Sequence, residues 1–451
     1  MAGSVALTLI LSQVIFAVHV LCAMKPADIL RHSITRHGYP VELHKVTTQD
    51  GYILSLVRIP GKSDKPPVLI VHGLLSSSVD WTVQGPDKSI AFIASDEGYD
   101  VWMANVRGNT FSKEHTTYSG KDREFWRFSF HEIGLYDLPA MVDYIRANTS
   151  TDTVHYVGHS QGGTAFLVMA SMRPAYNRKF ASVHLMAPAA YIHHATSPAF
   201  DFARRIDELE MFAKLTRSYE IGGRGPGSSM ELVYAGHKTG LVPTSLVLTN
   251  IWYLVGVHDS INRTVLGEIL ANTPAGCSVY QLLHFGQNYL AKSFQLYDYG
   301  PAGNVQRYGS KVPPEYPLHN VTAPIMLYYS AGDNFVPAED VEELADQLPN
   351  VVHKHRIGLR KWNHIDYLFD VSAHRLYRMI VASLRNQSAD ENRSQISHNQ
   401  HLQYACSTLT LKSLRTRNNK VQAKGTQLVS SKIKLSSQSA GVYTFPFGKI
   451  S

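Results

Sequence analysis

The chain has 451 residues, of which 44% are hydrophobic and 18% charged, enough for one large enzyme domain with an insertion or for two ordinary domains. The formal net charge is +7, but residues 386–451 contain nine Lys or Arg and two Asp or Glu and so account for all of it. The rest of the chain is neutral, which argues against nucleic acid as its partner.

The N-terminal run Val5–Ala23 is apolar and is followed by the first basic residue, Lys25. It predicts a secretory signal peptide over residues 1–23. The alternative is an uncleaved signal anchor, because about 19 apolar residues could also span a bilayer. No later stretch is long and apolar enough, so we expect a secreted or lysosomal protein without a permanent membrane span.

Residues 24–190 alternate short apolar runs, typical of buried strands, with longer amphipathic runs that are typical of helices. The expected strands are Val68–Val71, Tyr99–Ala104, Val154–Val157 and Val183–Met186, and the expected helices are Ser89–Glu97, Ile133–Ala147 and Thr164–Ser171. This alternation predicts an α/β fold with a mostly parallel central sheet and helices on both faces.

Residues 191–305 interrupt this rhythm and contain apolar stretches that look exposed, namely Leu246–Val257, Tyr280–Phe285 and Phe294–Tyr299. Strands resume at Ile325–Tyr329 and Val351–Ile357, before a closing helix around Ala373–Leu384. The simplest division is one core built from 24–190 and 306–385, with 191–305 inserted as a separate unit. The polar, basic tail 386–451 is expected to be disordered.

The pentapeptide Gly158-His159-Ser160-Gln161-Gly162 lies between an expected strand and an expected helix. A serine on such a tight, strained turn exposes its oxygen, and the flanking glycines remove side chains that would collide. The pattern occurs by chance in roughly one chain of this length in ten, so its position carries the argument. We expect Ser160 to be a nucleophile in acyl transfer and assign His159 no role as a base.

In this architecture the nucleophile is followed along the chain by the acid and then the histidine, each after a strand of the sheet. Asp333 and His364 satisfy that order. Two carboxylates compete with Asp333. We expect Asp340 to lie at a helix start and Asp366 to orient the loop around the histidine.

Two backbone donors for the developing oxyanion are expected, the N–H of Gln161 and the N–H of Leu74 in the turn His72-Gly73-Leu74-Leu75. Read alone, the His-Gly pair is equally typical of an ordinary turn at a strand end. The chain shows no spacing of metal-ligating residues, and we predict no metal site.

Cysteines are few: Cys22 belongs to the signal peptide, and a disulfide between the distant Cys277 and Cys406 is not favoured. Behind an export signal, several Asn-x-Ser/Thr sequons are expected to be glycosylated and therefore exposed. The candidate acceptors are Asn148, Asn262, Asn320, Asn386 and Asn392.

Several longer segments can be compared with known families: Gly38-Tyr39-Pro40, Thr48–Leu54, His72–Leu75 with Trp81, Gly98–Trp102, Arg107–Thr110, Glu124–Trp126, Phe128–Phe130, Tyr136–Ala140, Gly158–Gly162, Pro274–Gly276 and Asn363–Asp366. Together they resemble the acid lipase family of α/β-hydrolases, which contains gastric and lysosomal acid lipases. The resemblance runs from about Gly38 to Leu384 and leaves the tail out.

The resemblance implies a catalytic triad of Ser160, Asp333 and His364, and an oxyanion hole made by Leu74 and Gln161. It implies that 191–305 is a cap with a lid, and that no metal or organic cofactor is needed. The expected activity is hydrolysis of neutral lipid esters such as triacylglycerols at a lipid–water interface.

Two other functions stay open at this point. One is hydrolysis of cholesteryl esters or smaller carboxylic esters, because the acyl pocket depends on how the cap folds. The other is lipid binding without catalysis on the same scaffold.

Overall fold

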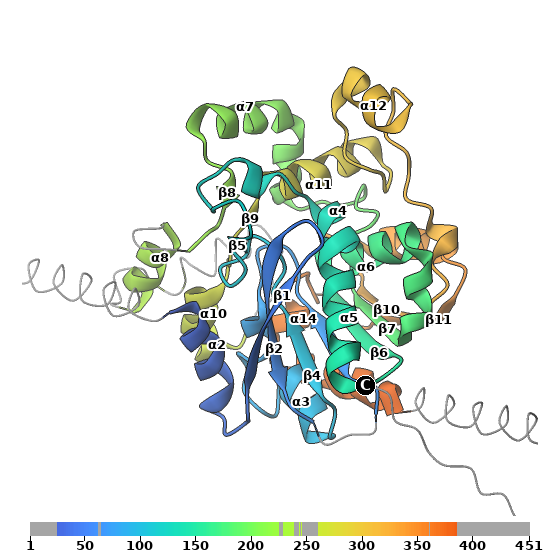
Figure 1. Cartoon of the computed structure of the whole chain (residues 1–451). Helices are drawn as coiled ribbons and strands as arrows, with labels where there is room; N and C mark the ends of the chain where they lie inside the picture. The colour runs from blue at the N-terminus through green and yellow to red at the C-terminus, as the bar shows by residue number, and fades with distance from the viewer. Residues whose placement is uncertain are drawn as a thin grey trace, which may run out of the picture. The chain divides into compact units, whose positions relative to one another are not determined.

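The computed structural model describes residues 25–61, 65–224, 229–238, 243, 245, 260–359 and 361–385 (Figure 1). The predicted signal peptide 1–23, the apolar stretch Leu246–Val257 and the tail 386–451 with Cys406 lie outside the described residues. Among the helices that the structure describes, none has the length and hydropathy needed to cross a bilayer.

A nine-stranded sheet organises the described part of the chain, in the order β1-β2-β4-β3-β6-β7-β10-β11 with β5 paired to β2. The run from β4 to β11 is parallel, and the pairings among β1, β2, β4 and β5 at the other edge are antiparallel. Its strands are β1 (Glu42–Thr47), β2 (Tyr52–Ile59), β3 (Val68–Val71), β4 (Val101–Ala104), β5 (Glu114–His115), β6 (Val154–His159), β7 (Phe180–Met186), β10 (Ile325–Ser330) and β11 (Val351–Ile357). The prediction of a mostly parallel sheet is confirmed.

Helices accompany the sheet along the whole described chain (Figure 1). They are α2 (Pro26–Thr35), α3 (Ile90–Asp96), α4 (Phe130–Glu132), α5 (Leu138–Thr149), α6 (Gln161–Met172), α7 (Ile206–Thr216), α8 (Ser229–Lys238), α10 (Leu266–Asn272), α11 (Val279–Ala291), α12 (Gly300–Tyr308), α13 (Ala338–Gln347), α14 (Asp366–Phe369) and a closing helix over 373–385. Every residue of β3, β4, β6 and β7 is buried, because helices leave no solvent-facing side on central parallel strands.

The predicted continuous helix Ile133–Ala147 is wrong in its first part. Residues Ile133–Asp137 form a π-helical turn between α4 and α5. This wider turn lies where Asp137 accepts hydrogen bonds from the backbone and side chain of Arg107, at 2.9 and 2.7 Å. It also lies where a side chain at Gly134 would meet the carbonyl oxygen of Ala165 in α6 at 2.6 Å. Such a local change of helical period is not visible in a hydrophobic pattern.

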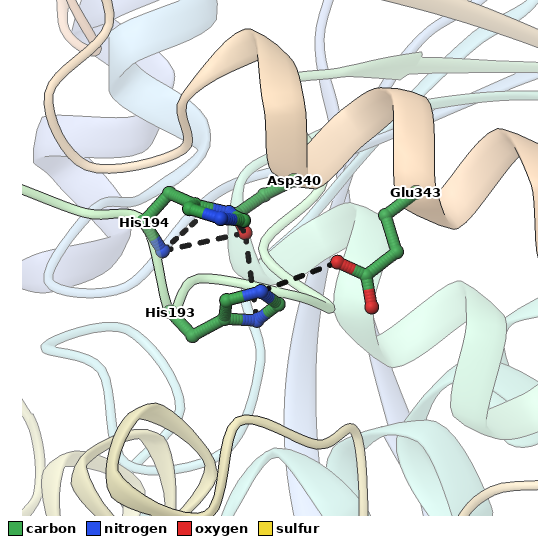
Figure 2. Close-up of side chains that lie close together, drawn as sticks. All are labelled: His193, His194, Asp340 and Glu343. Carbon is green, nitrogen blue, oxygen red and sulfur yellow. Dashed lines mark hydrogen bonds and ion pairs between the residues drawn. The ribbon is translucent and has the colours of Figure 1, made fainter.

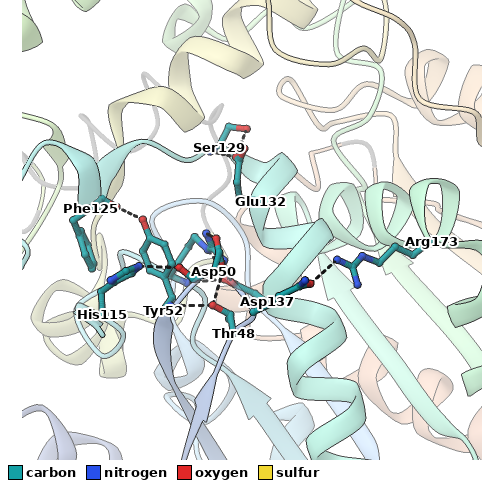
Figure 3. A network of polar contacts seen from close by, with 11 residues as sticks. Thr48, Asp50, Tyr52, His115, Phe125, Ser129, Glu132, Asp137 and Arg173 are labelled. Carbon is teal, nitrogen blue, oxygen red and sulfur yellow. Dashed lines mark hydrogen bonds and ion pairs between the residues drawn. The ribbon is translucent and has the colours of Figure 1, made fainter. Parts of the chain in front are cut away.

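Arg107 forms a buried ion cluster with Asp50 and Asp137. Figure 3 shows these two carboxylates within a wider network of polar contacts. The Arg107 side chain is 1% exposed and donates to both oxygens of Asp50, at 2.6 and 2.9 Å, as well as to Asp137. Burial raises the pKa of Asp137 to about 6, even though the guanidinium acts in the opposite direction. Removing one partner of such a cluster leaves an uncompensated buried charge, which typically destabilises a protein by about 3–5 kcal/mol.

The segment between β7 and β10 contains, besides α7, α8, α10, α11 and α12, a two-stranded ribbon of β8 (Glu220–Ile221) and β9 (Cys277–Ser278). The expectation that Tyr280–Phe285 and Phe294–Tyr299 are exposed is wrong for most of their apolar side chains. The rings of His284 and Phe285 contact Phe130 of α4 at centroid distances of 3.9 and 4.7 Å, and Phe294 is 1% exposed. The sequence pattern does not show this burial, because the partner ring, Phe130, lies about 150 residues earlier in the chain.

Candidate active site

Ser160 lies on the turn from β6 into α6, with φ 52° and ψ −119°. Its N–H donates to the carbonyl oxygen of Met186 at 2.9 Å, which fixes the turn against β7. A side chain at Gly162 would approach the carbonyl oxygen of Val71 to 2.5 Å, and one at Gly158 would approach Gly162 to 2.9 Å. Both glycines are therefore needed for the strained serine conformation.

The structure brings the two other expected residues to this serine. The Nε2 of His364 lies 2.8 Å from the Oγ of Ser160, and its Nδ1 lies 2.9 Å from the Oδ2 of Asp333. The other oxygen of Asp333 accepts hydrogen bonds from the N–H groups of Phe335 and Val336, both at 2.9 Å. All three side chains are largely buried, so the hydrogen-bonded chain is shielded from water.

The two rival carboxylates are engaged elsewhere. Asp340 lies in the first turn of α13 and accepts a hydrogen bond from the Nδ1 of His194 at 2.8 Å. Asp366 accepts the N–H of Asn363 at 2.6 Å, and burial raises its pKa to about 8, with neighbouring carboxylates adding to the shift. Asp333 is therefore the carboxylate that lies at the imidazole nitrogen remote from the serine.

The turn after β3 is shaped by His72, a role that the sequence does not reveal. The Nδ1 of His72 donates to the carbonyl oxygen of Gly73 at 2.8 Å, and its Nε2 accepts the N–H of Val106 at 3.2 Å. Burial lowers the pKa of His72 to about 4, so the ring stays neutral and can both donate and accept. The only indication of this role in the sequence is that His72 directly follows a fully buried strand, β3.

This turn lies directly against Ser160. A side chain at Gly73 would come within 3.1 Å of the Cβ of Ser160. Within the described residues, no backbone carbonyl takes the N–H of Leu74 or the N–H of Gln161. Gln161 directly follows Ser160, and Leu74 belongs to the turn that packs on Ser160, so both N–H groups are candidates for stabilising negative charge on an oxygen.

The side chain of Gln161 connects this region to the inserted segment. Its Oε1 accepts a hydrogen bond from the Nε2 of Gln281 at 2.8 Å, and both side chains are buried. Gln281 also caps α11, because its own Oε1 accepts the N–H of Ser278. Sequence reasoning missed this contact, since the two glutamines are 120 residues apart.

His159 supports the backbone of the neighbouring histidine. Its Nε2 lies 3.0 Å from the carbonyl oxygen of His364, to which it donates, and the two rings are 4.9 Å apart. Burial and the proximity of His364 hold the pKa of His159 well below its usual range. A neutral, fully buried ring in this place is suited to fixing the position of His364.

The sequons differ in accessibility. Asn148 is exposed, and Asn320 is partly buried with its amide donating to the carbonyl oxygen of Ser171. The expectation of an exposed acceptor is wrong for Asn262, which is 7% exposed. Its side-chain oxygen accepts the N–H and hydroxyl of Thr264, so the amide is part of a turn. Asn386 and Asn392 lie outside the described residues.

The chain matches two family models, described as "Partial alpha/beta-hydrolase lipase region" over residues 30–85 and "alpha/beta hydrolase fold" over residues 66–219. It is 40% identical to Lipase 3 of Drosophila melanogaster over 363 residues, which cover 78% of this chain and 92% of that protein. It is 33% identical both to human gastric triacylglycerol lipase and to human lysosomal acid lipase/cholesteryl ester hydrolase, in each case covering 78% of this chain and 89% of the relative.

The chain belongs to the acid lipase family. Its membership rests on a similarity that extends through nearly the whole length of these relatives, beyond the region around the serine. Acid lipases are carboxylic ester hydrolases of the α/β-hydrolase fold, and this chain is one of them. The resemblance seen in the sequence is confirmed.

Proposed function

We propose that this acid lipase hydrolyses neutral lipid esters, with triacylglycerols as the main substrate, through a covalent acyl-enzyme. The observation that carries the proposal is the hydrogen-bonded chain from the Oγ of Ser160 through His364 to Asp333, at 2.8 and 2.9 Å. A serine alone is a weak nucleophile, and a neighbouring imidazole oriented by a carboxylate makes it reactive.

In the first half of the reaction, the Nε2 of His364 removes the hydroxyl proton as the Oγ of Ser160 attacks the ester carbonyl carbon. The N–H groups of Leu74 and Gln161 stabilise the resulting oxyanion. Asp333 stabilises the imidazolium, which then gives its proton to the departing alcohol. In the second half, His364 takes a proton from water as the water oxygen attacks the acyl carbon. The bond from that carbon to the Oγ of Ser160 then breaks, His364 returns the proton to the Oγ, and the fatty acid leaves.

A lipid substrate is supported by the surface of the inserted segment, which we propose to be a cap over residues 191–305. Helix α7 leaves three large apolar side chains exposed, Met211, Phe212 and Leu215, at 58%, 61% and 77%. A cluster of this kind on a water-facing helix is typical of a surface that meets lipid or protein. Relatives with 34% and 33% identity bear the name gastric triacylglycerol lipase.

Cholesteryl esters are the second candidate substrate, because one relative is named lysosomal acid lipase/cholesteryl ester hydrolase. A panel of emulsified triacylglycerol, cholesteryl ester and short water-soluble ester, assayed with the same preparation, distinguishes them. We expect the highest kcat/KM on triacylglycerol. A clear preference for either of the other esters would replace it as the main substrate.

We also propose that residues 1–23 direct the chain into the secretory pathway, to the medium or to the lysosomal lumen. The gastric and lysosomal names of its relatives support this route. Among the described sequons, Asn148 is the acceptor whose exposure best suits glycosylation. Expression of the full chain in animal cells, followed by deglycosylation and fractionation, tests both points, and unglycosylated protein in the cytosol would contradict them.

The nucleophile is tested with Ser160→Ala. Removing the serine of such a triad lowers kcat by roughly 10⁴–10⁶-fold, so triacylglycerol hydrolysis should fall to background. A fluorophosphonate probe should label the wild type and not the variant, and circular dichroism should show both folded. Labelling or turnover that persists in a folded variant would place the nucleophile elsewhere.

A further inference from the structure

Four side chains that can bind metal converge outside the active site (Figure 2). His193 and His194 are consecutive residues in the turn after β7, and Asp340 and Glu343 lie three residues apart on α13. Residues three apart share one face of a helix, so both carboxylates face the turn. One ligand atom from each of the four lies within 4.8 Å of all the others.

The distances fit a single small cation between them. The Oδ1 of Asp340 lies 2.8 Å from the Nδ1 of His194 and 3.6 Å from the Nδ1 of His193, which is the His193 nitrogen that would bind the ion. The other nitrogen of His193, Nε2, lies 3.3 Å from Glu343, so the Glu343 carboxylate would have to turn from Nε2 toward the ion. With zinc–nitrogen and zinc–oxygen bonds of about 2.1 Å, ligand atoms of a tetrahedral site are about 3.4 Å apart. Small side-chain rotations would therefore complete the coordination.

The contacts within the cluster leave it incompletely satisfied. The Nδ1 of His193 is a buried ring nitrogen that lacks a hydrogen-bond partner in the part of the chain that the structure describes. The Asp340 side chain is fully buried, yet the ring that bonds to it, His194, is 51% exposed. A divalent cation would neutralise two carboxylates and give the Nδ1 of His193 a partner, which the protein groups alone do not achieve.

Hydrogen bonds to the backbone orient Asp340 in the absence of an ion. The backbone N–H of His194 donates to the Oδ2 of Asp340 at 3.2 Å, and this bond orients the carboxylate independently of the imidazoles. Asp340 itself is fixed in the first turn of α13, where its N–H donates to the carbonyl oxygen of Pro337. Preorganised ligands lose less conformational freedom on binding, which favours affinity.

We propose that His193, His194, Asp340 and Glu343 bind one divalent transition-metal ion of the class that takes nitrogen and oxygen ligands, with Zn²⁺ as its representative. Two imidazoles with two carboxylates suit Zn²⁺ and disfavour Ca²⁺ or Mg²⁺, which prefer oxygen alone. A sequence search for metal-ligand spacing does not find this cluster, because its halves are 146 residues apart in sequence.

The proposed ion joins two segments that flank the loop of Asp333. Between the paired histidines and that loop, the N–H groups of Thr196 and Ser197 donate to the carbonyl oxygen of Asn334, at 3.0 and 3.1 Å. The ion would thus stabilise the surroundings of the catalytic acid without contacting substrate. Its role is structural, and it takes no part in the proton transfers.

The test is calorimetric titration of ZnCl₂ into the full chain after chelation and removal of the chelator. We expect one high-affinity equivalent per chain and a rise in Tm on loading. Since losing a group that merely supports a ligand often weakens metal affinity about 10–100-fold, Glu343→Gln should weaken it at least about tenfold. Glu339→Gln, an exposed site on the same helix with the same charge change, is the matched control and should bind as the wild type does.

A second control addresses surface histidines in general. His353 and His355 on β11 lie with their ring centroids 6.3 Å apart and outside the cluster. The double variant His353→Gln/His355→Gln should retain the high-affinity equivalent, whereas His193→Gln should lose it. The proposal is overturned if the wild type shows no saturable binding, if Glu343→Gln binds as tightly as the wild type, or if the β11 double variant loses the ion.

Discussion

Two carboxylates near the connection from β10 to α13 each contact a histidine ring, and the two contact distances are almost equal. The Nδ1 of His364 lies 2.9 Å from Asp333, and the Nδ1 of His194 lies 2.8 Å from Asp340. Both carboxylates are fully buried. A distance between imidazole and carboxylate therefore does not by itself distinguish a catalytic pair.

The difference lies in what surrounds each ring. The second nitrogen of His364 meets a serine hydroxyl on a strained turn, at 2.8 Å, and its ring stacks on Phe335. The ring of His194 is half exposed and has another imidazole beside it, with centroids 4.2 Å apart. The first arrangement is suited to passing a proton in a dry site, and the second to holding an ion.

The strongest test of the difference between Asp333 and Asp340 is to neutralise each carboxylate in turn. Asp333→Asn should lower kcat by roughly 10⁴-fold, because an asparagine favours the wrong imidazole tautomer and cannot stabilise the imidazolium. Asp340→Asn should leave kcat of the folded enzyme within about tenfold of the wild type, although an imperfectly replaced buried hydrogen bond destabilises by about 1–3 kcal/mol. Initial rates on a triacylglycerol emulsion measure both.

Active-site titration with a fluorophosphonate keeps these rates interpretable, because it counts the folded, competent molecules in each preparation. If Asp340→Asn lost more turnover per titrated site than Asp333→Asn, the assignment of the two carboxylates would be reversed.

A third buried carboxylate, Asp366, should make the stability of the protein depend on pH. Burial raises its pKa from the ordinary 3.8 to about 8, so the folded state binds a proton that the unfolded state releases. Its contribution to stability is complete below about pH 4 and is lost as pH rises toward 8, with a slope of at most about 1.4 kcal/mol per pH unit. Asp366→Asn cannot ionise, so the variant should gain stability relative to the wild type as pH increases.

Urea unfolding of the wild type and Asp366→Asn at pH 5, 6.5 and 8 measures this difference. The exposed Asp201 provides the control, and Asp201→Asn should track the wild type at every pH. A constant gap between Asp366→Asn and the wild type across this range would contradict a protonated, buried Asp366.

The smallest expected effect concerns His194 itself. In metal-free protein, His194→Gln should change the free energy of unfolding by less than about 1 kcal/mol, since the lost contact involves a half-exposed ring. The same substitution at His364 should abolish turnover, because no base remains for Ser160. Paired assays of the two variants test this, and a large activity loss in His194→Gln would show that the two clusters are coupled.

Predicted and observed strands agree for the fully buried β3 and also for β11, whose residues are all exposed or half-buried. Val68–Val71 and Val351–Ile357 coincide with β3 and β11, and the start of β6 is found at Val154. The antiparallel strands β1 and β2 were not identified. Strand β1 lies at the edge of the sheet and is mostly exposed or half-buried, whereas in the largely buried β2 the polar residues Ser55 and Arg58 interrupt the apolar run. The π-helical turn Ile133–Asp137 was not predicted for a different reason. Its Asp137 bonds to a buried residue, Arg107, that is distant in sequence.

The sequence predicts some residues of the candidate site and misses others. Ser160, Asp333 and His364 follow sheet strands in a fixed chain order, so local pattern and order together point to them. His72, Gln281 and the paired histidines at 193 and 194 act through partners that are remote in sequence, and no local pattern announces such contacts.

The hydrogen bond between Gln161 and Gln281 has a consequence for protein engineering. If residues 191–305 form the cap that we propose, exchanging them with those of another lipase is a route to a new substrate range. The exchange would also replace the side chain that holds the first residue of α6, next to the nucleophile. A chimera that keeps a glutamine at this place can inherit a new acyl pocket with an intact reaction centre, whereas one that lacks it changes specificity and turnover together.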